Sequence, residues 1–344
     1  MIQFQCDYNE GAHPRILERM VETNFEQTVG YGEDHYCEEA RQLIKKACGR
    51  EDADIHFLVG GTQANATVIS SILKPYQGVV CAHTGHINVH ETGAIEHGGH
   101  KVLAVVSENG KLSAEGLLGA IESHYEEDGP EHTVQPGMVY ISFSTETGTI
   151  YSLSELEDIR KICDNYSIPL FIDGARLGYG LASEGCDVTL NDIARIANIF
   201  YIGGTKQGAL FGEAVVITDN RMKKDFRYFI KQNGGMLAKG RLLGIQFLAL
   251  FEDDLYFKLA SHAVNQALRI RDAFIRKGFS FLAESPSNQQ FPILPDEVLK
   301  KLNEDYLFSI WQKTDEGHTA VRVCTSWATK TEAVDGLIAA IEAL

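Results

Sequence analysis

The sequence predicts an α/β protein, with a large domain built on a mostly parallel sheet of seven strands and a smaller α+β domain at its C-terminal end. Two observations predict this. Short apolar runs alternate with helical patterns from about residue 54 to 220, and the pattern then becomes almost wholly helical before short strands return. Most of the runs are apolar on both faces, which is typical of strands that helices cover on both sides. The expected strands are Ile55–Val59, Val79–Ala82, Val102–Val106, Val139–Phe143, Pro169–Asp173, Ile199–Ile202 and Ala214–Thr218.

Capping signals mark the helices between these strands. The run Ser154-Glu155-Leu156-Glu157 reads as a capping box that opens a helix to about Tyr166. Ser113 is placed to cap a helix that ends near Glu126. Before the first strand we expect two helices, Pro14–Gln27 and Glu33–Cys48.

The chain beyond the sheet region is expected to begin with helices and to end as a small domain. Residues 221–277 look almost wholly helical, with one long helix from Asp254 onward. Short strands over 280–282, 307–311 and 320–324 and a last helix over 331–344 follow. We therefore expect an N-terminal helical segment (1–50), a large domain (51–254) and a small C-terminal α+β domain (255–344).

Composition excludes several classes of partner. The 344 residues carry a net charge of −16, which argues against nucleic acid or an anionic membrane surface as partner. The seven cysteines are scattered and never spaced as C-x-x-C, so we expect reduced thiols and a cytoplasmic protein. The N-terminus has no signal-peptide pattern, and no apolar run reaches transmembrane length.

Two segments that each follow an expected strand suggest the chemistry. Phe171–Arg176 ends in Asp173 and Arg176, and Tyr201–Lys206 ends in Thr205 and Lys206. The carboxyl ends of strands in open α/β sheets are where ligands bind. A lysine amine can bond covalently to the aldehyde of pyridoxal 5′-phosphate, and a carboxylate can keep its pyridine nitrogen protonated. The alternatives are a local Asp–Arg ion pair and a surface lysine.

A glycine turn could hold the phosphate of such a cofactor. Gly60-Gly61-Thr62 follows the first expected strand and opens a helix, so free backbone N–H groups and the Thr62 hydroxyl could face an anion. An ordinary tight turn with a helix cap would show the same residues.

Three further side chains are candidates for the same site. His86 and His90 have the spacing of a metal-binding helix, but no third ligand is evident, so stacking of a ring on a flat cofactor, or a plain capping or surface role, is favoured over a metal. Glu146 is a candidate acid or base, although it could also belong to a turn stabilised by threonines. Arg322 could capture a substrate carboxylate, although alternation along its strand could place it toward solvent.

Taken together, Gly61-Thr62-Gln63-Ala64-Asn65, His86 with Glu91, Asp173-Gly174-Ala175-Arg176 and Gly204-Thr205-Lys206 resemble the L-threonine aldolase/β-eliminating lyase family over nearly the whole chain. The resemblance implies the fold of the fold-type I pyridoxal phosphate enzymes. It also implies an aldehyde-lyase that cleaves L-threonine, L-allo-threonine and related β-hydroxy-α-amino acids to glycine and an aldehyde.

The resemblance also implies roles for individual residues. Lys206 would bond to the cofactor, Asp173 would pair with its ring nitrogen, His86 would stack on the ring, and Gly61, Thr62 and Thr205 would contact the cofactor. Arg176 would contact the cofactor or substrate, and Arg322 would bind the substrate carboxylate. Tyr31 in the N-terminal segment would close the site from a neighbouring subunit, since family members are dimers or tetramers with sites at the interface.

Two positions depart from the family pattern. Glu146 stands where threonine aldolases typically have a histidine near the substrate hydroxyl, so Glu146 becomes a candidate base beside His86 and a bound water. Cys6-Asp7-Tyr8 stands where the family usually has Ser-Asp-Thr, so Cys6 becomes a candidate substrate contact. The alternatives to an aldolase are another pyridoxal phosphate reaction, such as β-elimination or transamination, and a non-catalytic protein that binds the cofactor or phosphate.

Overall fold

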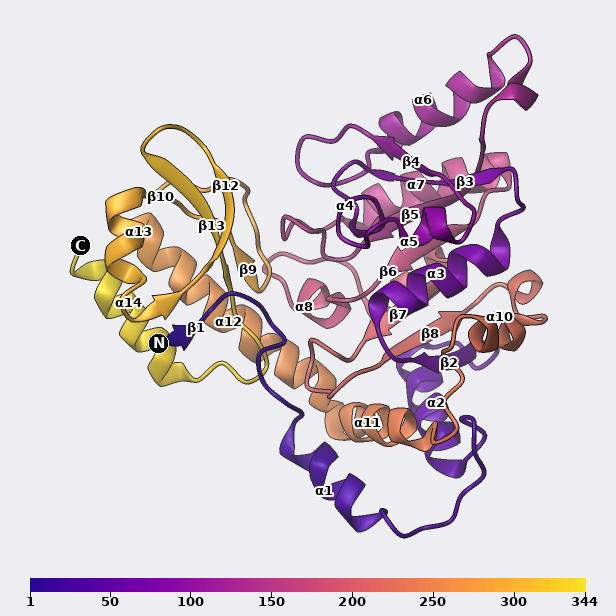
Figure 1. Cartoon of the computed structure of the whole chain (residues 1–344), viewed down its shortest axis with the longest axis horizontal. Coiled ribbons are helices and arrows are strands. Elements are labelled where there is room, and N and C mark those ends of the chain that lie inside the picture. The colour runs from indigo at the N-terminus through magenta and orange to yellow at the C-terminus, as the bar shows by residue number, and fades with distance from the viewer.

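The computed structural model, which describes residues 1–344, has a seven-stranded sheet at its centre (Figure 1). The strand order across the sheet is β2-β8-β7-β6-β5-β3-β4, and β8 alone runs antiparallel to its neighbours. The strands are β2 (Asp54–Leu58), β3 (Gln77–Ala82), β4 (Val102–Val105), β5 (Gln135–Ser142), β6 (Leu170–Asp173), β7 (Ile199–Gly203) and β8 (Glu213–Ile217). All seven expected strands are present, which confirms the predicted mostly parallel α/β sheet.

Helices cover both faces of this sheet because successive residues of its strands point to opposite sides and both sides are apolar. Val139 of β5 belongs to the larger apolar cluster, which includes side chains of α2, α6, α7, α9 and α11. Its neighbour Met138 belongs to a second cluster, which includes side chains of α3, α5 and α10. The helices of this part are α1 (Pro14–Glu22), α2 (His35–Cys48), α3 (Gly61–Ile72), α4 (His86–Val89), α5 (Ala94–His97), α6 (Ala114–Tyr125), α7 (Leu153–Tyr166), α8 (Leu177–Leu181), α9 (Leu190–Ile196), α10 (Phe226–Gln232) and α11 (Arg241–Phe251).

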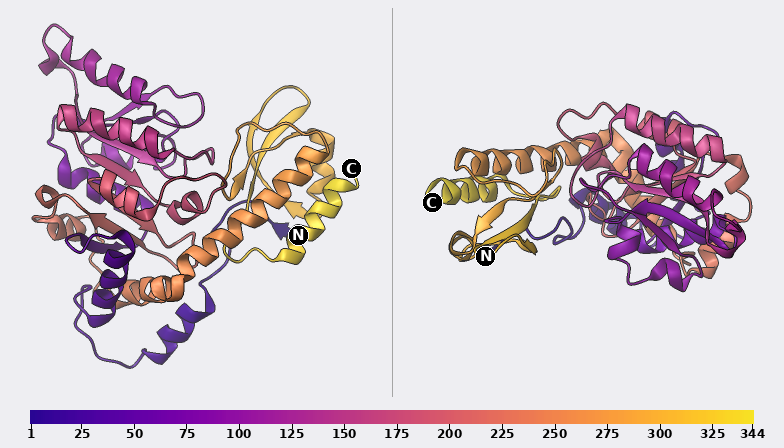
Figure 2. Two further views of the ribbon diagram at one scale, coloured as in Figure 1. Left: turned by 180° about the vertical axis from the view of Figure 1, so that it is seen from behind. Right: turned by 90° about the horizontal axis from the view of Figure 1, so that it is seen from above.

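The C-terminal part is a small α+β unit joined to the large one by the long helix α12, which crosses between them in every view (Figure 2). Its main sheet has the antiparallel order β10-β13-β12, and β9 pairs with β13. The elements are α12 (Leu255–Arg276), β9 (Gln289–Gln290), β10 (Ile293–Pro295), α13 (Asp296–Leu302), β11 (Tyr306–Leu307), β12 (Ser309–Lys313), β13 (His318–Cys324) and α14 (Thr331–Glu342).

The N-terminus packs with this C-terminal unit. Strand β1 (Ile2–Gln3) pairs in parallel with β11, and Phe4 lies in the apolar cluster that contains Phe274 and Val321. The predicted domain boundaries at residues 50 and 254 stay a prediction. These contacts show that the first four residues pack with the small C-terminal unit.

Three local expectations were wrong. Helix α7 is capped by Ser152, not Ser154: the Ser152 hydroxyl accepts from the Glu155 N–H, and the Glu155 carboxylate accepts from the Ser152 N–H. Both registers satisfy the same S-x-x-E pattern, so the pattern alone does not distinguish them. The strand expected over 280–282 is reduced to one bridge, between Phe281 and Pro292. The first helix ends at Glu22, because the chain turns away after its C-cap Thr23.

Two 3₁₀ turns, Asn220–Met222 and Glu252–Asp254, interrupt the region expected to be almost wholly helical; a third, Pro130–His132, precedes β5. None of the helices combines the length and the hydrophobicity that crossing a membrane requires.

Candidate active site

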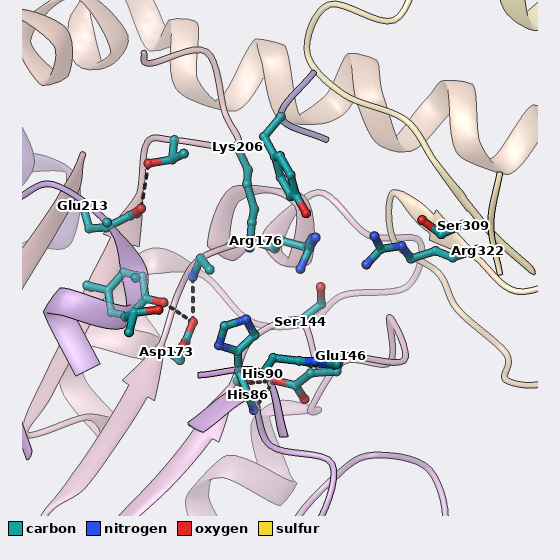
Figure 3. Close-up of a pocket in the computed structure, with 18 of the residues that line it drawn as sticks. His86, His90, Ser144, Glu146, Asp173, Arg176, Lys206, Glu213, Ser309 and Arg322 are labelled. Atoms are coloured by element: carbon teal, nitrogen blue, oxygen red, sulfur yellow. Dashed lines mark hydrogen bonds between the residues drawn. The ribbon is translucent and has the colours of Figure 1, made fainter. Parts of the chain in front are cut away.

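A cavity of about 680 Å³ lies between the carboxyl ends of the central strands and the small C-terminal unit (Figure 3). The sheet topology explains why distant motifs meet there, since the loops after parallel neighbouring strands emerge at one edge. Nine of the eleven predicted site residues line this cavity: Gly61, Thr62, His86, Glu146, Asp173, Arg176, Thr205, Lys206 and Arg322. Cys6 and Tyr31 do not.

Asp173, the last residue of β6, is a buried carboxylate held by four donors. The Tyr140 and Tyr201 hydroxyls each donate to it at 2.5 Å, the Ala175 N–H at 2.9 Å and the Asn65 amide at 3.1 Å. Burial favours the neutral acid, but nearby His86 and the hydrogen bonds from the two tyrosines outweigh it and hold the pKa of Asp173 below its ordinary value. A buried negative charge therefore faces the cavity.

Lys206 follows β7 and points into the same cavity (Figure 3). Burial and the positive charge of Arg176 lower the pKa of its amine, although Asp7, Asp173 and Glu213 oppose the shift. A lowered pKa increases the fraction of neutral amine, which is the form that attacks an aldehyde.

The glycine turn lies at one end of the cavity. Helix α3 begins at Gly61, and its N-cap Gly60 offers no side-chain hydrogen bond, so the first N–H groups of the helix are free to bind an anion. Thr62 and Thr205 also line the cavity. A Cβ on Gly61 would come within 3.1 Å of the Tyr201 hydroxyl, so the turn fits tightly over the residues around Asp173.

His86 is the first residue of α4 and is held by a chain of polar contacts. Its Nδ1 lies 2.7 Å from Glu91 Oε1, and the same oxygen accepts from the Asn65 amide at 2.7 Å. Asn65 therefore connects the carboxylates of Glu91 and Asp173. The metal alternative gains no support, because no group of three or more metal-ligating side chains is assembled.

Glu146 lies beside His86 at the opposite wall from Lys206 (Figure 3). Its Oε1 accepts from the His86 N–H at 3.0 Å and from the Ser142 hydroxyl at 2.7 Å. Burial raises the pKa of this carboxyl, while the Ser142 hydrogen bond works in the opposite direction. A carboxyl with a raised pKa is suited to exchange protons near neutral pH.

Two arginines approach from different parts of the chain. Arg176 pairs with Asp7, with Nε at 2.7 Å from Oδ2 and Nη2 at 2.9 Å from Oδ1. Arg322 of β13 donates from Nη2 to the Gln5 carbonyl at 2.9 Å and lies 5.7 Å from the Trp311 ring centroid. The Arg322 Nε is buried without a partner, so a donor remains for an anionic ligand.

The structure separates the two remaining predicted residues from this cavity. Cys6 lies two residues from Tyr8, which does line it, but the Cys6 thiol donates to Asn9 Oδ1 at 2.9 Å. Tyr31 is half-exposed on the surface, where its ring centroid lies 5.2 Å from Lys231 Nζ.

The sequence predicts no role for several residues that line the cavity, among them Glu213 and Trp311. Trp311 lies on the strand that pairs with the strand of Arg322, but at a register shift between Ile310 and Gln312, so alternation along the strand does not predict which way it faces. Glu213 carries no local signal, since only the pairing of β8 between β2 and β7 brings it to the site.

The residues fit pyridoxal 5′-phosphate. An ionised carboxylate, a lysine with a lowered pKa and free N–H groups at a helix start surround one cavity, which matches the ring nitrogen, the aldehyde and the phosphate of that molecule. The unpartnered Arg322 Nε and Ser144 Oγ add polar groups for a further ligand.

Comparisons with known proteins agree with this geometry. A low specificity L-threonine aldolase from a Pseudomonas species is 29% identical over 350 residues, covering 99% of this chain and 97% of the relative. The structure of a threonine aldolase from Leishmania major superposes with a TM-score of 0.97 at 41% identity, covering 100% of this chain and 99% of that one.

A more distant structure supports the fold. A variant of Thermus thermophilus aspartate aminotransferase matches with a TM-score of 0.72 at 14% identity, covering 100% of this chain and 92% of that one. The fold is that of the fold-type I pyridoxal phosphate enzymes. The sequence also matches the family described as beta-eliminating lyase over residues 3–291. The chain therefore belongs to the beta-eliminating lyase family.

Proposed function

We propose that this protein is a pyridoxal phosphate-dependent aldolase that cleaves L-threonine, L-allo-threonine and related β-hydroxy-α-amino acids to glycine and an aldehyde. The observation that carries the proposal is the meeting of Asp173 and Lys206 in one cavity, with both pKa values shifted downward. The threonine aldolases among the relatives support the choice of aldolase over β-elimination or transamination.

The cofactor would be held at three points. Lys206 would bond to its aldehyde carbon, Asp173 would face its ring nitrogen, and Gly61 and Thr62 would bind its phosphate, with Thr205 beside the cofactor next to Lys206. His86, whose ring orientation is set by Glu91, would lie against the ring face. When bound, pyridoxal phosphate supplies a sink for the electron pair released as the Cα–Cβ bond breaks.

The chain must supply a base for the β-hydroxyl proton of the substrate. Glu146 is suited to this, because it is a carboxylate with a raised pKa that keeps an oxygen facing the cavity. The hydrogen bonds from Ser142 and from the His86 N–H hold its orientation. His86 is the other candidate for this role.

Arg322 would orient the substrate by its carboxylate. A guanidinium binds a carboxylate through parallel donors, and Arg322 has an unpartnered Nε beside the cavity. The two hydrogen bonds to Asp7 hold the Arg176 guanidinium in position. Arg176 would contact the cofactor or the substrate. Cys6 would contact the substrate only if the N-terminal segment shifts on binding.

We also propose that the active form is a homodimer or homotetramer with sites at the subunit interface. Tyr31 lies outside the cavity of its own chain, so its proposed role in site closure requires a second copy. Val21, Phe25 and Val29 expose apolar side chains in the same N-terminal region. The seven free cysteines support a cytoplasmic location, where the reaction would serve amino-acid and glycine metabolism.

The test is an assay of the purified protein with pyridoxal phosphate and with L-threonine, L-allo-threonine or phenylserine. We expect a coloured protein whose absorbance changes on borohydride reduction, and glycine plus an aldehyde as products. Lys206→Ala should lose both properties, whereas the exposed Lys161→Ala should keep both. Pyruvate and ammonia from serine or cysteine, without glycine from threonine, would contradict the aldolase.

A further inference from the structure

An acidic side chain lies at the end of the cavity proposed to bind phosphate. Glu213 is the first residue of β8, is 3% exposed and lines the cavity. Its register places it opposite Gly203 of β7 and opposite Leu58 of β2. The loop after β2 holds Gly61 and Thr62, and the loop after β7 holds Thr205 and Lys206, so Glu213 sits between the two loops.

The contacts of Glu213 connect it to the proposed phosphate site. Oε1 accepts from the Thr205 hydroxyl at 2.8 Å, and Oε2 accepts from the Gly204 N–H at 3.2 Å. The Thr205 hydroxyl in turn accepts from the Gly212 N–H at 3.0 Å. The other acceptor of the Thr205 hydroxyl, the Gly212 carbonyl, lies farther away at 3.5 Å, and neither acceptor directs the hydroxyl proton at the cavity.

An ionised Glu213 would oppose a phosphate bound in this position. Two like charges in a water-poor site raise each other's proton affinity, so one of them takes up a proton or the ligand binds weakly. A neutral carboxylic acid removes the repulsion and adds an O–H donor, while its oxygens can still accept from Thr205 and Gly204.

We propose that Glu213 faces the cofactor phosphate as a neutral carboxylic acid, so that binding of the phosphate group takes up one proton at this residue. The proposal rests on the proposed function, because it concerns the phosphate of the same cofactor. It assigns to Glu213 a positioning role in the phosphate site and predicts that affinity for the cofactor depends on pH.

The charges around Glu213 agree with this assignment. Burial raises the pKa of Glu213 to about 8, against the opposing effects of Thr205 and Lys206. Asp173 raises it further, and the Gly204 N–H lowers it. The other titratable groups that feel its charge are the hydroxyls of Tyr201 and Tyr256, which are neutral phenols with pKa values raised by burial.

The experiment measures binding to the apoprotein between pH 6.5 and 9.5, a range that spans about one and a half units on either side of the raised pKa. The probe is pyridoxine 5′-phosphate, which has an alcohol in place of the aldehyde and cannot bond to Lys206. Its dissociation constant should rise with pH, approaching about tenfold per pH unit once free Glu213 is ionised. Pyridoxine without the phosphate should lack this dependence.

Variants separate Glu213 from other titrating groups. Glu213→Gln, which is neutral at every pH, should bind the probe at high pH as tightly as the wild type does at low pH. Glu126→Gln, which removes an exposed carboxylate after α6, should keep the wild-type slope. Because Lys206 also titrates, the slope should persist in Lys206→Ala and disappear when Glu213→Gln is added.

Calorimetry in buffers of different ionisation enthalpy gives a second readout that needs no variant. Near the pKa of Glu213 the wild type should take up a fraction of a proton per probe bound, rising toward one at higher pH. Affinity that does not change with pH, an unchanged slope in Glu213→Gln, or loss of binding by Glu213→Gln at low pH would overturn the proposal. If threonine is still cleaved in that case, the proposed function stands without it; if no pyridoxal compound binds at any pH, the proposed function fails as well.

Discussion

Arg176 and Asp7 form a two-point ion pair, with Nε at 2.7 Å from Oδ2 and Nη2 at 2.9 Å from Oδ1. The pair joins the loop after β6 to the N-terminal segment, and Asn288 of the small unit donates to the same carboxylate at 2.9 Å. Three parts of the chain therefore meet at one fully buried carboxylate beside the cavity. Burial opposes the charge of Asp7, but Arg176 and Lys206 together lower its pKa to about 2.

Asp7→Asn should destabilise the protein, because it leaves the Arg176 guanidinium buried without its counter-charge. Removing one partner of a buried ion pair costs about 3–5 kcal/mol, which urea unfolding at pH 7 would measure. The pKa is depressed, so the stabilisation is present above the ordinary pKa of 3.8 and is lost as pH falls toward about 2. The difference between wild type and variant should shrink over that range.

The matched control is Asp253→Asn, which breaks the pair of Arg15 with an exposed carboxylate. Exposed pairs contribute little, so its unfolding curve should overlay that of the wild type. Equal stability of Asp7→Asn and wild type at pH 7 would contradict the role given to the buried pair.

Tyr201→Phe should weaken cofactor binding by removing one of the two hydroxyls that donate to Asp173. A hydrogen bond to a charged group contributes about 1.5–3 kcal/mol, so we expect a loss of affinity of roughly tenfold to a hundredfold. The pKa of Asp173 should rise, because the ionised form loses a donor. Titration with pyridoxal phosphate, followed by absorbance, measures the effect.

Tyr140→Phe should have a similar effect, since the Tyr140 hydroxyl donates to the other oxygen of the Asp173 carboxylate. Tyr125→Phe, at an exposed ring on α6, should bind the cofactor as the wild type does. Unchanged affinity and absorption spectrum in Tyr201→Phe and Tyr140→Phe would show that Asp173 does not need these donors.

Glu146→Gln should lower kcat by about 10²–10⁴-fold, the usual contribution of a positioned acid or base. Ser142→Ala tests the same role while keeping the Glu146 carboxyl, because the Ser142 hydroxyl lowers the pKa of Glu146. If ionised Glu146 is the base, activity rises as pH rises through its pKa. Ser142→Ala should therefore move the acidic limb of the kcat profile to higher pH.

Ser123→Ala, at an exposed hydroxyl on α6, is the control for this profile and should leave it in place. An acidic limb that stays in place in Ser142→Ala, together with an active Glu146→Gln, would move the role of base to His86.

Arg322→Lys should raise KM for L-threonine more than it lowers kcat, since it keeps the charge but removes the planar fork that binds a carboxylate. Loss of one charge-assisted hydrogen bond predicts a fall in kcat/KM of roughly tenfold to a hundredfold. Arg269→Lys, which keeps a charge opposite Asp335 on the surface, should leave both constants unchanged. An unchanged KM in Arg322→Lys would remove Arg322 from substrate binding.

The seven central strands could be predicted because their signal is local. Runs such as Leu170–Ile172 and Ile199–Ile202 are apolar at every position, and such runs form strands only when helices cover both faces. The capping of α7 could be predicted only within two residues, because Ser152 and Ser154 both fit the pattern and backbone geometry selects Ser152.

Sequence alone determined the mostly parallel sheet, the residue types of the candidate site and the edge of the sheet at which they gather. Tertiary structure decided which charges face one another: that Asp7 pairs with Arg176, that Asn65 links Glu91 to Asp173, and that Glu213 reaches the phosphate end. The reason is that burial and electrostatic interactions act through space. Asp7 and Arg176 are 169 residues apart in the chain but in direct contact in the fold, and no local pattern records that contact.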